Sequence, residues 1–334
     1  MKTPFWFLRK NIIAWVLWPL SFVYNLVGQI IYIIRLFRKK TSKSPVICIG
    51  GLLAGGVGKT PIVREVASRF GAPVVMRGYG GLKSKGWGLV DSADSSKDIG
   101  DEAKMLAAKG LKVYVGDRWN NIQAINRTDR SYSPIIMDDG FQNPVIKKNI
   151  SILVFDGKIG VGNGFVLPAG PLRESLWFGI ARSDAVIIID DAAPSDVIKS
   201  YARILKKPVF LAKKEILNPG LFGKVIPFAG IGYPAKFFDS VSSMPKIRII
   251  ESVSFPDHHV YQKSDFVKLF KLARRHDAEL VCTEKDWVKF PENIKKKIKH
   301  IPMTIDIQPE FWKWIEDKLG TKGRGIEKNS RNRP

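Results

Sequence analysis

The chain has 334 residues, of which 45% are hydrophobic, so it is long enough for two modest domains with a sizeable core. Its two cysteines, Cys48 and Cys282, exclude a disulfide-stapled scaffold and the paired spacing of a zinc site, and they favour a reducing compartment. The formal net charge of +23 favours contact with an anionic surface or substrate, and phospholipid and nucleic acid both qualify.

The N-terminal end favours phospholipid. Residues 1–43 contain eight Lys or Arg and no acidic residue, and 318–334 carry a net +5. Residues 12–34 are uncharged and, as a helix, would be about 35 Å long, enough to cross a bilayer. Their Trp and Tyr residues and the basic flanks suit a membrane interface. A spanning helix and a helix in the cytoplasmic leaflet both stay open, and a buried core helix or a signal peptide is less favoured. We expect residues 1–40 to form a membrane-associated helix.

Further along the chain, short apolar runs alternate with helical patterns, which is typical of parallel α/β layers. The sequence predicts strands at 46–49, 73–76, 112–115, 135–137, 150–155, 185–189, 208–211, 225–229, 279–282 and 301–305. Helical patterns include 61–70, 101–109 and 263–275. Because these strands are many for one sheet, we expect a P-loop NTPase-type domain over 41–165 and a second, smaller α/β domain over 166–310. Residues 311–334 are expected to form a C-terminal helix and a basic tail.

The segment "GLLAGGVGKTP" (51–61) has the composition of a phosphate-binding loop. It follows a predicted buried strand and precedes a predicted helix, so its backbone N–H groups would face phosphate. Lys59 would add charge, and the Thr60 hydroxyl would bind Mg²⁺. The predicted nucleotide-binding residues are Gly55, Gly56, Val57, Gly58, Lys59 and Thr60. Leu53 stands where the generic loop has glycine, so we expect a variant class, and the alternative is a tight turn before a helix.

Polar residues follow several predicted strands at the point where each ends. A Mg²⁺–nucleotide enzyme needs a carboxylate there, and Asp138 and Asp139 follow the run at 135–137. Arg77 and Arg118 follow two further strands, and Asp101-Glu102 lies at a helix start. Ligands bind at the carboxyl ends of parallel strands, which favours a functional role. The alternative for the acidic residues is that they cap turns or complement a helix dipole.

Two motifs lie in the second half of the chain. "LPAGPLRE" (167–174) is a loop rich in glycine and proline that ends in Arg173-Glu174, and "FPDHHVY" (255–261) contains His258 and His259. Because no Cys/His cluster accompanies the two histidines, zinc is disfavoured, and an acid–base or phosphate-contacting histidine is favoured.

Together these stretches resemble the tetraacyldisaccharide 4'-kinases, the lipid A 4'-kinases of Gram-negative bacteria. The resemblance covers most of the chain and rests on "WPLSFVYNL", "GGVGKTP", "RGYGG", "DIGDEAKML", "DDGFQ", "LPAGPLRE", "FAGIGYPAKFF", "FPDHHVY" and "VCTEKDWVK" in this order. The family's loop also lacks the generic first glycine, which accounts for Leu53. An Asn-Xaa-Thr type stretch is usual in the family where Gly51-Leu52-Leu53 stand here.

The resemblance implies a kinase on the cytoplasmic face of the inner membrane. It would transfer the γ-phosphoryl group of ATP to the 4'-hydroxyl of a tetraacylated, 1-phosphorylated glucosamine disaccharide, with Mg²⁺ as cofactor. The metal-organising residues implied are Thr60, Glu102, Asp138 and Asp139. Asp101 and His258 are implied as the base on the sugar hydroxyl, and Lys59 and Arg118 as further catalytic residues. Contacts to substrate or phosphate are implied for Arg77, Gln142, Arg173 and His259.

A membrane-recruited partitioning-type P-loop ATPase is the alternative, because "GGVGKT" also resembles that class. That class usually carries a lysine where Ala54 stands, and its membrane helix is usually C-terminal. Nucleic-acid binding is disfavoured because the body of the chain shows no basic–aromatic binding motif. We expect a monomer whose partners are the lipid substrate and a membrane surface with anionic lipid.

Overall fold

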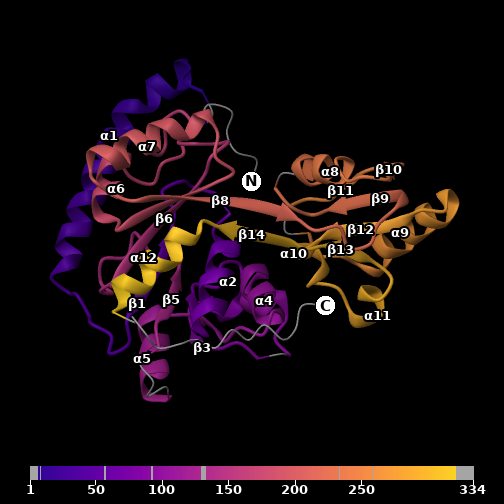
Figure 1. Ribbon diagram of the computed structural model, residues 1–334, viewed down its shortest axis with the longest axis horizontal. Coiled ribbons are helices and arrows are strands. Elements are labelled where there is room, and N and C mark those ends of the chain that lie inside the picture. Colours follow the sequence, from indigo (N-terminus) through magenta and orange to yellow (C-terminus); the bar gives the residue numbers. More distant parts are fainter. Residues whose placement is uncertain are drawn as a thin grey trace.

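The structure is a computed structural model that describes Phe7 and residues 9–55, 58–91, 93–128, 133–232, 234–257 and 259–320. It contains two β-sheets with helices packed against them (Figure 1). The chain builds most of the first sheet up to β8 (Val209–Ile216) and then forms the second sheet. It returns to the first sheet with β14 (Met303–Ile307) (Figure 1). The expected α/β fold with a large sheet and a smaller second one is confirmed.

Within the described residues, nine strands form the first sheet in the order β14-β8-β7-β6-β1-β5-β2-β4-β3. In chain order they are β1 (Val46–Gly50), β2 (Val74–Met76), β3 (Trp87–Leu89), β4 (Val113–Gly116), β5 (Ile135–Asp138), β6 (Ile150–Asp156), β7 (Ala185–Ile189), β8 (Val209–Ile216) and β14 (Met303–Ile307). The central strands are parallel, and the edge strands β3 and β14 are antiparallel to β4 and β8. β8 continues beyond the predicted 208–211 because β14 pairs with it as far as Ile216.

Helices cover both faces of the first sheet. α2 (Lys59–Phe70), α4 (Asp101–Ala108) and α12 (Pro309–Leu319) pack on one face, and α5 (Arg118–Thr128), α6 (Leu176–Arg182) and α7 (Asp196–Ile204) pack on the other. Alternate residues of a strand enter the two cores, so that Ile47 and Ile49 of β1 face one set of helices and Cys48 faces the other. The short helix α3 (Ser96–Ile99) directly precedes α4. Burial on both faces explains why these strands read as continuous apolar runs.

The second sheet is parallel throughout its described strands. They are β9 (Gly223–Ala229), β10 (Ile247–Ile249), β11 (Val253–Ser254), β12 (Glu279–Thr283) and β13 (Lys299–Ile301). Side chains of α8 (Pro234–Ser242) and α9 (Lys263–His276) enter two separate cores of this sheet. The helices α10 (Glu284–Trp287) and α11 (Glu292–Lys295) lie between β12 and β13.

The division between the sheets corrects the expected domain boundaries. β6, β7 and β8 belong to the first sheet, so that sheet extends to Ile216 rather than to 165. The second sheet spans 223–301 rather than 166–310, and β14 rejoins the first sheet before α12. The physical reason is that buried parallel strands share one composition whichever sheet they join, so only their pairing partners show the boundary. The predicted C-terminal helix corresponds to α12, and the predicted basic tail (321–334) lies outside the described residues.

The N-terminal helix α1 (Ile12–Leu36) is long and apolar enough to cross a membrane, and only 6% of its most apolar window is buried. The side chains of Trp15, Val16 and Phe22 remain exposed. One side of the helix contacts the rest of the protein, where the Ala169 N–H donates a hydrogen bond to the buried Ser21 hydroxyl (2.9 Å). The buried-core alternative for this segment is therefore wrong, and α1 presents a large apolar face to its surroundings.

Candidate active site

A cavity of about 2960 Å³ is lined by side chains from both sheets and their helices. From the second sheet's side it is lined by Gly232, Lys236 and Asp257, among others. The predicted site residues that line it are Gly55, Gly58, Lys59, Thr60, Arg77, Asp101, Glu102, Arg118, Asp138, Asp139, Gln142 and Arg173. Gly56, Val57 and His258 lie outside the described residues. The fold thus brings together loops that follow the carboxyl ends of β1, β2, β4 and β5, as parallel strands require.

The phosphate loop leads from β1 into α2. Gly58 is the N-cap of α2 with a φ of 77°, a left-handed conformation that glycine adopts without strain. Gly58 has no side chain to cap this helix end, which leaves the first N–H groups of α2 suited to bind an anion. Leu53 is buried and forms an antiparallel bridge with Leu172, and the Ala54 N–H donates to the Pro171 carbonyl (2.7 Å). The "LPAGPLRE" segment therefore braces the loop at the position where the generic loop has glycine.

Asp139 is ion-paired with two cations of the site. Its Oδ1 lies 3.2 Å from Lys59 Nζ, and its Oδ2 lies 3.1 Å from Arg173 Nη1. Burial acts to raise the pKa of Asp139, but the charges of Lys59 and Arg173 outweigh it and hold the pKa below its ordinary value. The backbone of Asp139 has a φ of 50°, which is uncommon outside glycine and clusters at functional sites. This turn directs the carboxylate at the loop lysine.

Asp138 is the second strand-end carboxylate, and it is almost fully buried. Burial, reinforced by the neighbouring charge of Glu102, raises the pKa of Asp138 to about 7. Its Oδ1 has no hydrogen-bond partner among the described residues. A buried carboxylate oxygen without a donor fits a cation ligand, and Thr60 and Glu102 line the same cavity.

No group of three or more His, Cys, Asp or Glu side chains within the described residues is arranged to hold a metal by itself. Mg²⁺ is usually held by one or two carboxylates, and waters and substrate phosphates complete its octahedron. The residues present therefore fit Mg²⁺ that arrives with a nucleotide, and they do not form a preassembled protein cage.

Two arginines flank these carboxylates. Arg118 Nη2 donates to the backbone carbonyls of Asp138 (3.1 Å) and Asp139 (3.0 Å), so it holds the turn that carries both acids. Burial lowers the pKa of Arg118, and its Nε finds no hydrogen-bond partner among the described residues. Arg77 is exposed on the cavity wall. Arg118 therefore has a structural contact that the sequence did not indicate, in addition to its place at the cavity.

Asp101 begins α4, and the second half of the chain contacts it. Lys289 Nζ lies 3.1 Å from Asp101 Oδ2. Glu284, which begins α10, lies 2.6 Å from Lys109 Nζ and 3.7 Å from Arg64 Nη1. The "VCTEKDWVK" segment therefore joins the second sheet to α2 and α4. The sequence alone indicated the resemblance of this segment to a known family, but it did not indicate that Lys289 contacts Asp101.

His259 is paired with a carboxylate outside the cavity. Its Nε2 lies 2.9 Å from Asp265 Oδ2 at the start of α9, and its ring stacks on Phe255 at 4.7 Å. His259 is not among the residues that line the cavity, whereas its near neighbour Asp257 is. The substrate contact expected for His259 stays a prediction, and in this structure its side chain pairs with Asp265 instead.

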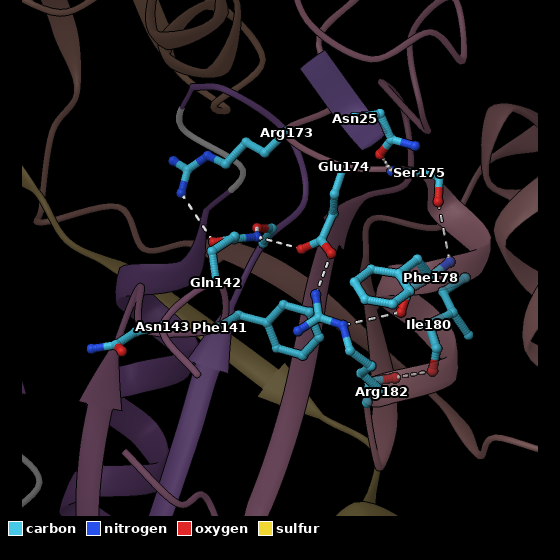
Figure 2. A network of polar contacts seen from close by, with 12 residues as sticks. Asn25, Phe141, Gln142, Asn143, Arg173, Glu174, Ser175, Phe178, Ile180 and Arg182 are labelled. Carbon is cyan, nitrogen blue, oxygen red and sulfur yellow. Dashed lines mark hydrogen bonds and ion pairs between the residues drawn. The ribbon is translucent and has the colours of Figure 1, made fainter. Parts of the chain in front are cut away.

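Gln142 and Arg173 lie in a network of polar contacts (Figure 2). Gln142 Nε2 donates to Glu174 Oε1 (3.1 Å) and to the Gly51 carbonyl (3.0 Å), and Glu174 pairs with Arg182. Both Gln142 and Arg173 line the cavity, and the Gln142 amide nitrogen is engaged by two acceptors of the protein; its predicted contact with substrate stays a prediction.

A charged cluster that sequence reasoning missed lines the same cavity. Asp156 ends β6 and is buried, and Asp190 follows β7 with a φ of 52°. Lys214 Nζ lies 3.5 Å from Asp156 Oδ2 and 3.9 Å from Asp190 Oδ2. A Cβ added at Gly58 would lie 3.5 Å from Lys214 Nζ, so this lysine stands beside the phosphate loop. The rule that found Asp138, an acid directly after an apolar strand, would have found both carboxylates.

Comparisons with known proteins agree with one another. The sequence model of the family described as "Tetraacyldisaccharide-1-P 4'-kinase" matches residues 13–320. The chain is similar to the tetraacyldisaccharide 4'-kinase of Phenylobacterium zucineum, with 36% identity over 93% of this chain and 96% of that protein. It is similar to that of Paramagnetospirillum magneticum, with 34% identity over 96% and 100%. In fold it is similar to "apo" form LpxK from Aquifex aeolicus in complex with ATP, with a TM-score of 0.73, 24% identity and coverage of 93% and 99%.

Proposed function

The chain belongs to the tetraacyldisaccharide 4'-kinase family, and on that premise we propose how it transfers the γ-phosphoryl group of ATP to the 4'-hydroxyl of a tetraacylated, 1-phosphorylated glucosamine disaccharide in lipid A biosynthesis. The observation that carries the proposal is that the loop lysine, the strand-end carboxylates and the acid of α4 line one cavity. Phosphoryl transfer needs positioning and charge neutralisation, and this cavity offers both. The partitioning-type ATPase, suggested by the loop alone, gains no support from a family match that spans both sheets.

The phosphate groups of ATP are proposed to lie at the N-terminus of α2. Lys59 would add positive charge there, and Arg77 and Arg173 would face the transferred group from the other loops of the cavity. Asp139 positions Lys59 and Arg173 through its two ion pairs, and Arg118 positions Asp139 through the backbone. The cations are thus held in place before ATP arrives, which reduces reorganisation during transfer.

The residues proposed to hold Mg²⁺ are Thr60, Glu102 and Asp138. Asp139, which is ion-paired with Lys59 and Arg173, would support this arrangement from the adjacent position. Support comes from the buried Asp138 Oδ1, which lacks a hydrogen-bond partner among the described residues. Hydroxyl and carboxylate oxygens are the ligands this ion prefers. When bound with ATP, Mg²⁺ would neutralise charge on the β- and γ-phosphate oxygens.

Asp101, together with His258, is proposed as the base for the sugar hydroxyl. A hydroxyl is a weak nucleophile until its proton has an acceptor, and a carboxylate within the cavity can take that proton as the new O–P bond forms. Support comes from Asp101 and Asp257, which line the same cavity from the two sheets, although position 258 itself lies outside the described residues.

α1 is proposed to hold the enzyme on the cytoplasmic face of the inner membrane. Support comes from its exposed apolar face and from the basic residues Arg35, Arg38, Lys39 and Lys40 at its C-terminal end. The apolar face would enter the acyl region, and the basic residues would meet anionic headgroups. A membrane-bound enzyme meets a tetraacylated substrate within the surface where that lipid resides.

The test is to incubate the purified full-length protein with Mg-ATP and the 1-phosphorylated tetraacyl disaccharide in detergent micelles. One phosphate added at the 4'-position, identified by mass and by NMR, supports the proposal. Phosphate at another position contradicts it, and ATP hydrolysis without transfer favours the partitioning-type ATPase. Lys59→Ala serves as the control that separates this activity from a contaminating kinase.

A further inference from the structure

Three consecutive residues after the "LPAGPL" turn contact different parts of the molecule (Figure 2). Arg173 pairs with Asp139 of the phosphate site at 3.1 Å. Two positions later, the Ser175 N–H donates to Asn25 Oδ1 of α1 at 3.1 Å. Between them, Glu174 is buried with 8% of its surface exposed. The membrane helix and the phosphate site are therefore joined through a segment of three residues.

Glu174 pairs with Arg182, which ends α6. The Arg182 guanidinium carbon lies 4.1 Å from the ring centre of Tyr32 on α1, 4.4 Å from that of Phe178 on α6 and 4.7 Å from that of Phe141 after β5. A planar guanidinium can stack on rings while its N–H groups bind a carboxylate, which an ammonium cannot do. Arg182 thus contacts the membrane helix, its own helix and the loop that follows the strand-end acids.

Gln142 completes the connection to the phosphate site. Its Nε2 donates to Glu174, and its Oε1 lies 3.5 Å from Arg173 Nη1 (Figure 2). Releasing Arg182 would leave Glu174 with an uncompensated buried charge, and Glu174 orients Gln142 together with the Gly51 carbonyl. A shift of Gln142 would then reach Arg173 directly.

α6 also packs on the phosphate loop without a gap. A Cβ on Gly179 would lie 2.4 Å from Cδ1 of the buried Leu52, so α6 packs directly against this side chain. The Arg173 N–H donates to the Leu52 carbonyl at 2.7 Å, which ties the backbone of the joining segment to the same residue. A displacement of α6 is therefore transmitted to the loop and is not absorbed by a void.

We propose that Arg182 is a positioning residue for phosphoryl transfer, because it links the docking of α1 to the placement of Arg173 and Asp139. The proposal assigns α1 a second task besides membrane anchoring: its docked position sets the geometry of the phosphate site. It rests on the proposed function, since Arg173 and Asp139 affect turnover only if phosphate groups lie beside them.

The experiment measures kcat and KM for both substrates with full-length protein in lipid–detergent mixed micelles. Arg182→Lys keeps the charge but loses the planar fork, and we expect kcat to fall roughly 10- to 100-fold. The KM for ATP should change by less than about threefold, because Arg182 does not touch the nucleotide site. Tyr32→Leu should lower kcat by a smaller factor. The double variant should be no slower than Arg182→Lys, because both changes break one connection.

Two controls accompany these variants. Arg203→Lys changes an exposed arginine on α7 and should leave kcat at the wild-type value. Glu174→Gln keeps the shape and removes the charge, so it carries the same test if Arg182→Lys does not fold. The inference would be overturned by an unchanged kcat in Arg182→Lys, or by a fall in activity that only matches the fall in folded protein. It would also be overturned if the reductions in kcat caused by Arg182→Lys and Tyr32→Leu were fully additive. A wild-type protein that transfers no phosphate contradicts the proposed function instead, so the two failures are distinct.

Discussion

Lys289, which follows α10 beside the second sheet, places its Nζ atom 3.1 Å from the Oδ2 of Asp101 at the start of α4. Both side chains are nearly buried, with 9% and 10% exposed, and the same ammonium lies 3.4 Å from the buried carboxylate of Asp286. Asp286 in turn accepts a hydrogen bond from the Gly230 N–H at 3.0 Å. The carboxylate proposed as the base is therefore held from the second sheet's side, so the active site depends on how the two sheets meet.

Replacing Lys289 with methionine should weaken both the fold and turnover. Removing one partner from a buried ion pair destabilises a protein by about 3–5 kcal/mol, because the remaining charge stays buried without compensation. We therefore expect a lower melting temperature and a lower kcat per folded molecule, and Lys289→Arg should recover part of both. Calorimetry and steady-state kinetics measure the two effects, with Lys296→Met at an exposed position as the control. Wild-type stability and turnover in Lys289→Met would contradict a positioning role for this lysine.

Lys59→Ala and Asp139→Ala should each lose most turnover while the protein stays folded. Lys59 supplies charge at the phosphates, and Asp139 orients it through a 3.2 Å ion pair, so each loss should reach roughly 10²–10³-fold in kcat. The double variant should be little slower than the slower single one, because the two residues act together. Circular dichroism checks the fold. Unchanged turnover in folded Lys59→Ala protein would falsify the nucleotide-site assignment.

Charged substitutions on the exposed face of α1 should release the protein from membranes. Deletion of residues 1–40 would also remove contacts such as the one between Ser21 and Ala169, so point substitutions isolate the membrane contact. Val16 and Val23 are 72% and 53% exposed, and Asp at each disfavours membrane insertion by up to about 3 kcal/mol. We expect Val16→Asp/Val23→Asp to lose flotation with anionic liposomes and to raise the KM for lipid more than that for ATP. Membrane binding of this variant at high salt, where electrostatic attraction is screened, would place the anchor elsewhere.

Asp101→Ala and His258→Ala should each reduce kcat by roughly 10²–10⁴-fold, the usual contribution of general acid–base catalysis. Because a base and the histidine that orients it act as one unit, the double variant should be little worse than the slower single variant. A double-mutant cycle at saturating ATP and lipid measures this. Fully additive losses would indicate separate roles. If Asp101 only pairs with Lys289 at the start of α4, the outcome is instead a stability loss of about 3–5 kcal/mol with near-normal turnover in the folded fraction.

His259→Ala provides the matched control for this cycle. Since His259 pairs with Asp265 and stacks on Phe255, we expect lower thermal stability and a kcat close to the wild-type value. A His259→Ala variant that reproduces the turnover defect while His258→Ala does not would move the proposed catalytic histidine by one position.

Local sequence was sufficient to locate most strands and the glycine-rich turn that leads from β1 into α2. Buried parallel strands read as uninterrupted apolar runs, so each predicted strand corresponds to one in the structure. The exception is the last run, 301–305, which Pro302 divides between β13 and β14 in different sheets. β3, β10 and β11 were missed because they have two or three residues each and are partly exposed, which leaves no pattern to read.

The residue types at the ends of the strands can be read from the sequence alone, because glycine, lysine and aspartate follow apolar runs within a few positions of one another. How distant segments contact these residues depends on the folded structure. Asn25 meets Ser175 across 150 residues of chain, and Lys289 meets Asp101 across the two sheets. The boundary between the sheets and the task of Arg182 depend on such contacts too. Their physical basis is side-chain packing and charge pairing between separate elements, and these leave no periodic trace in either partner's own sequence.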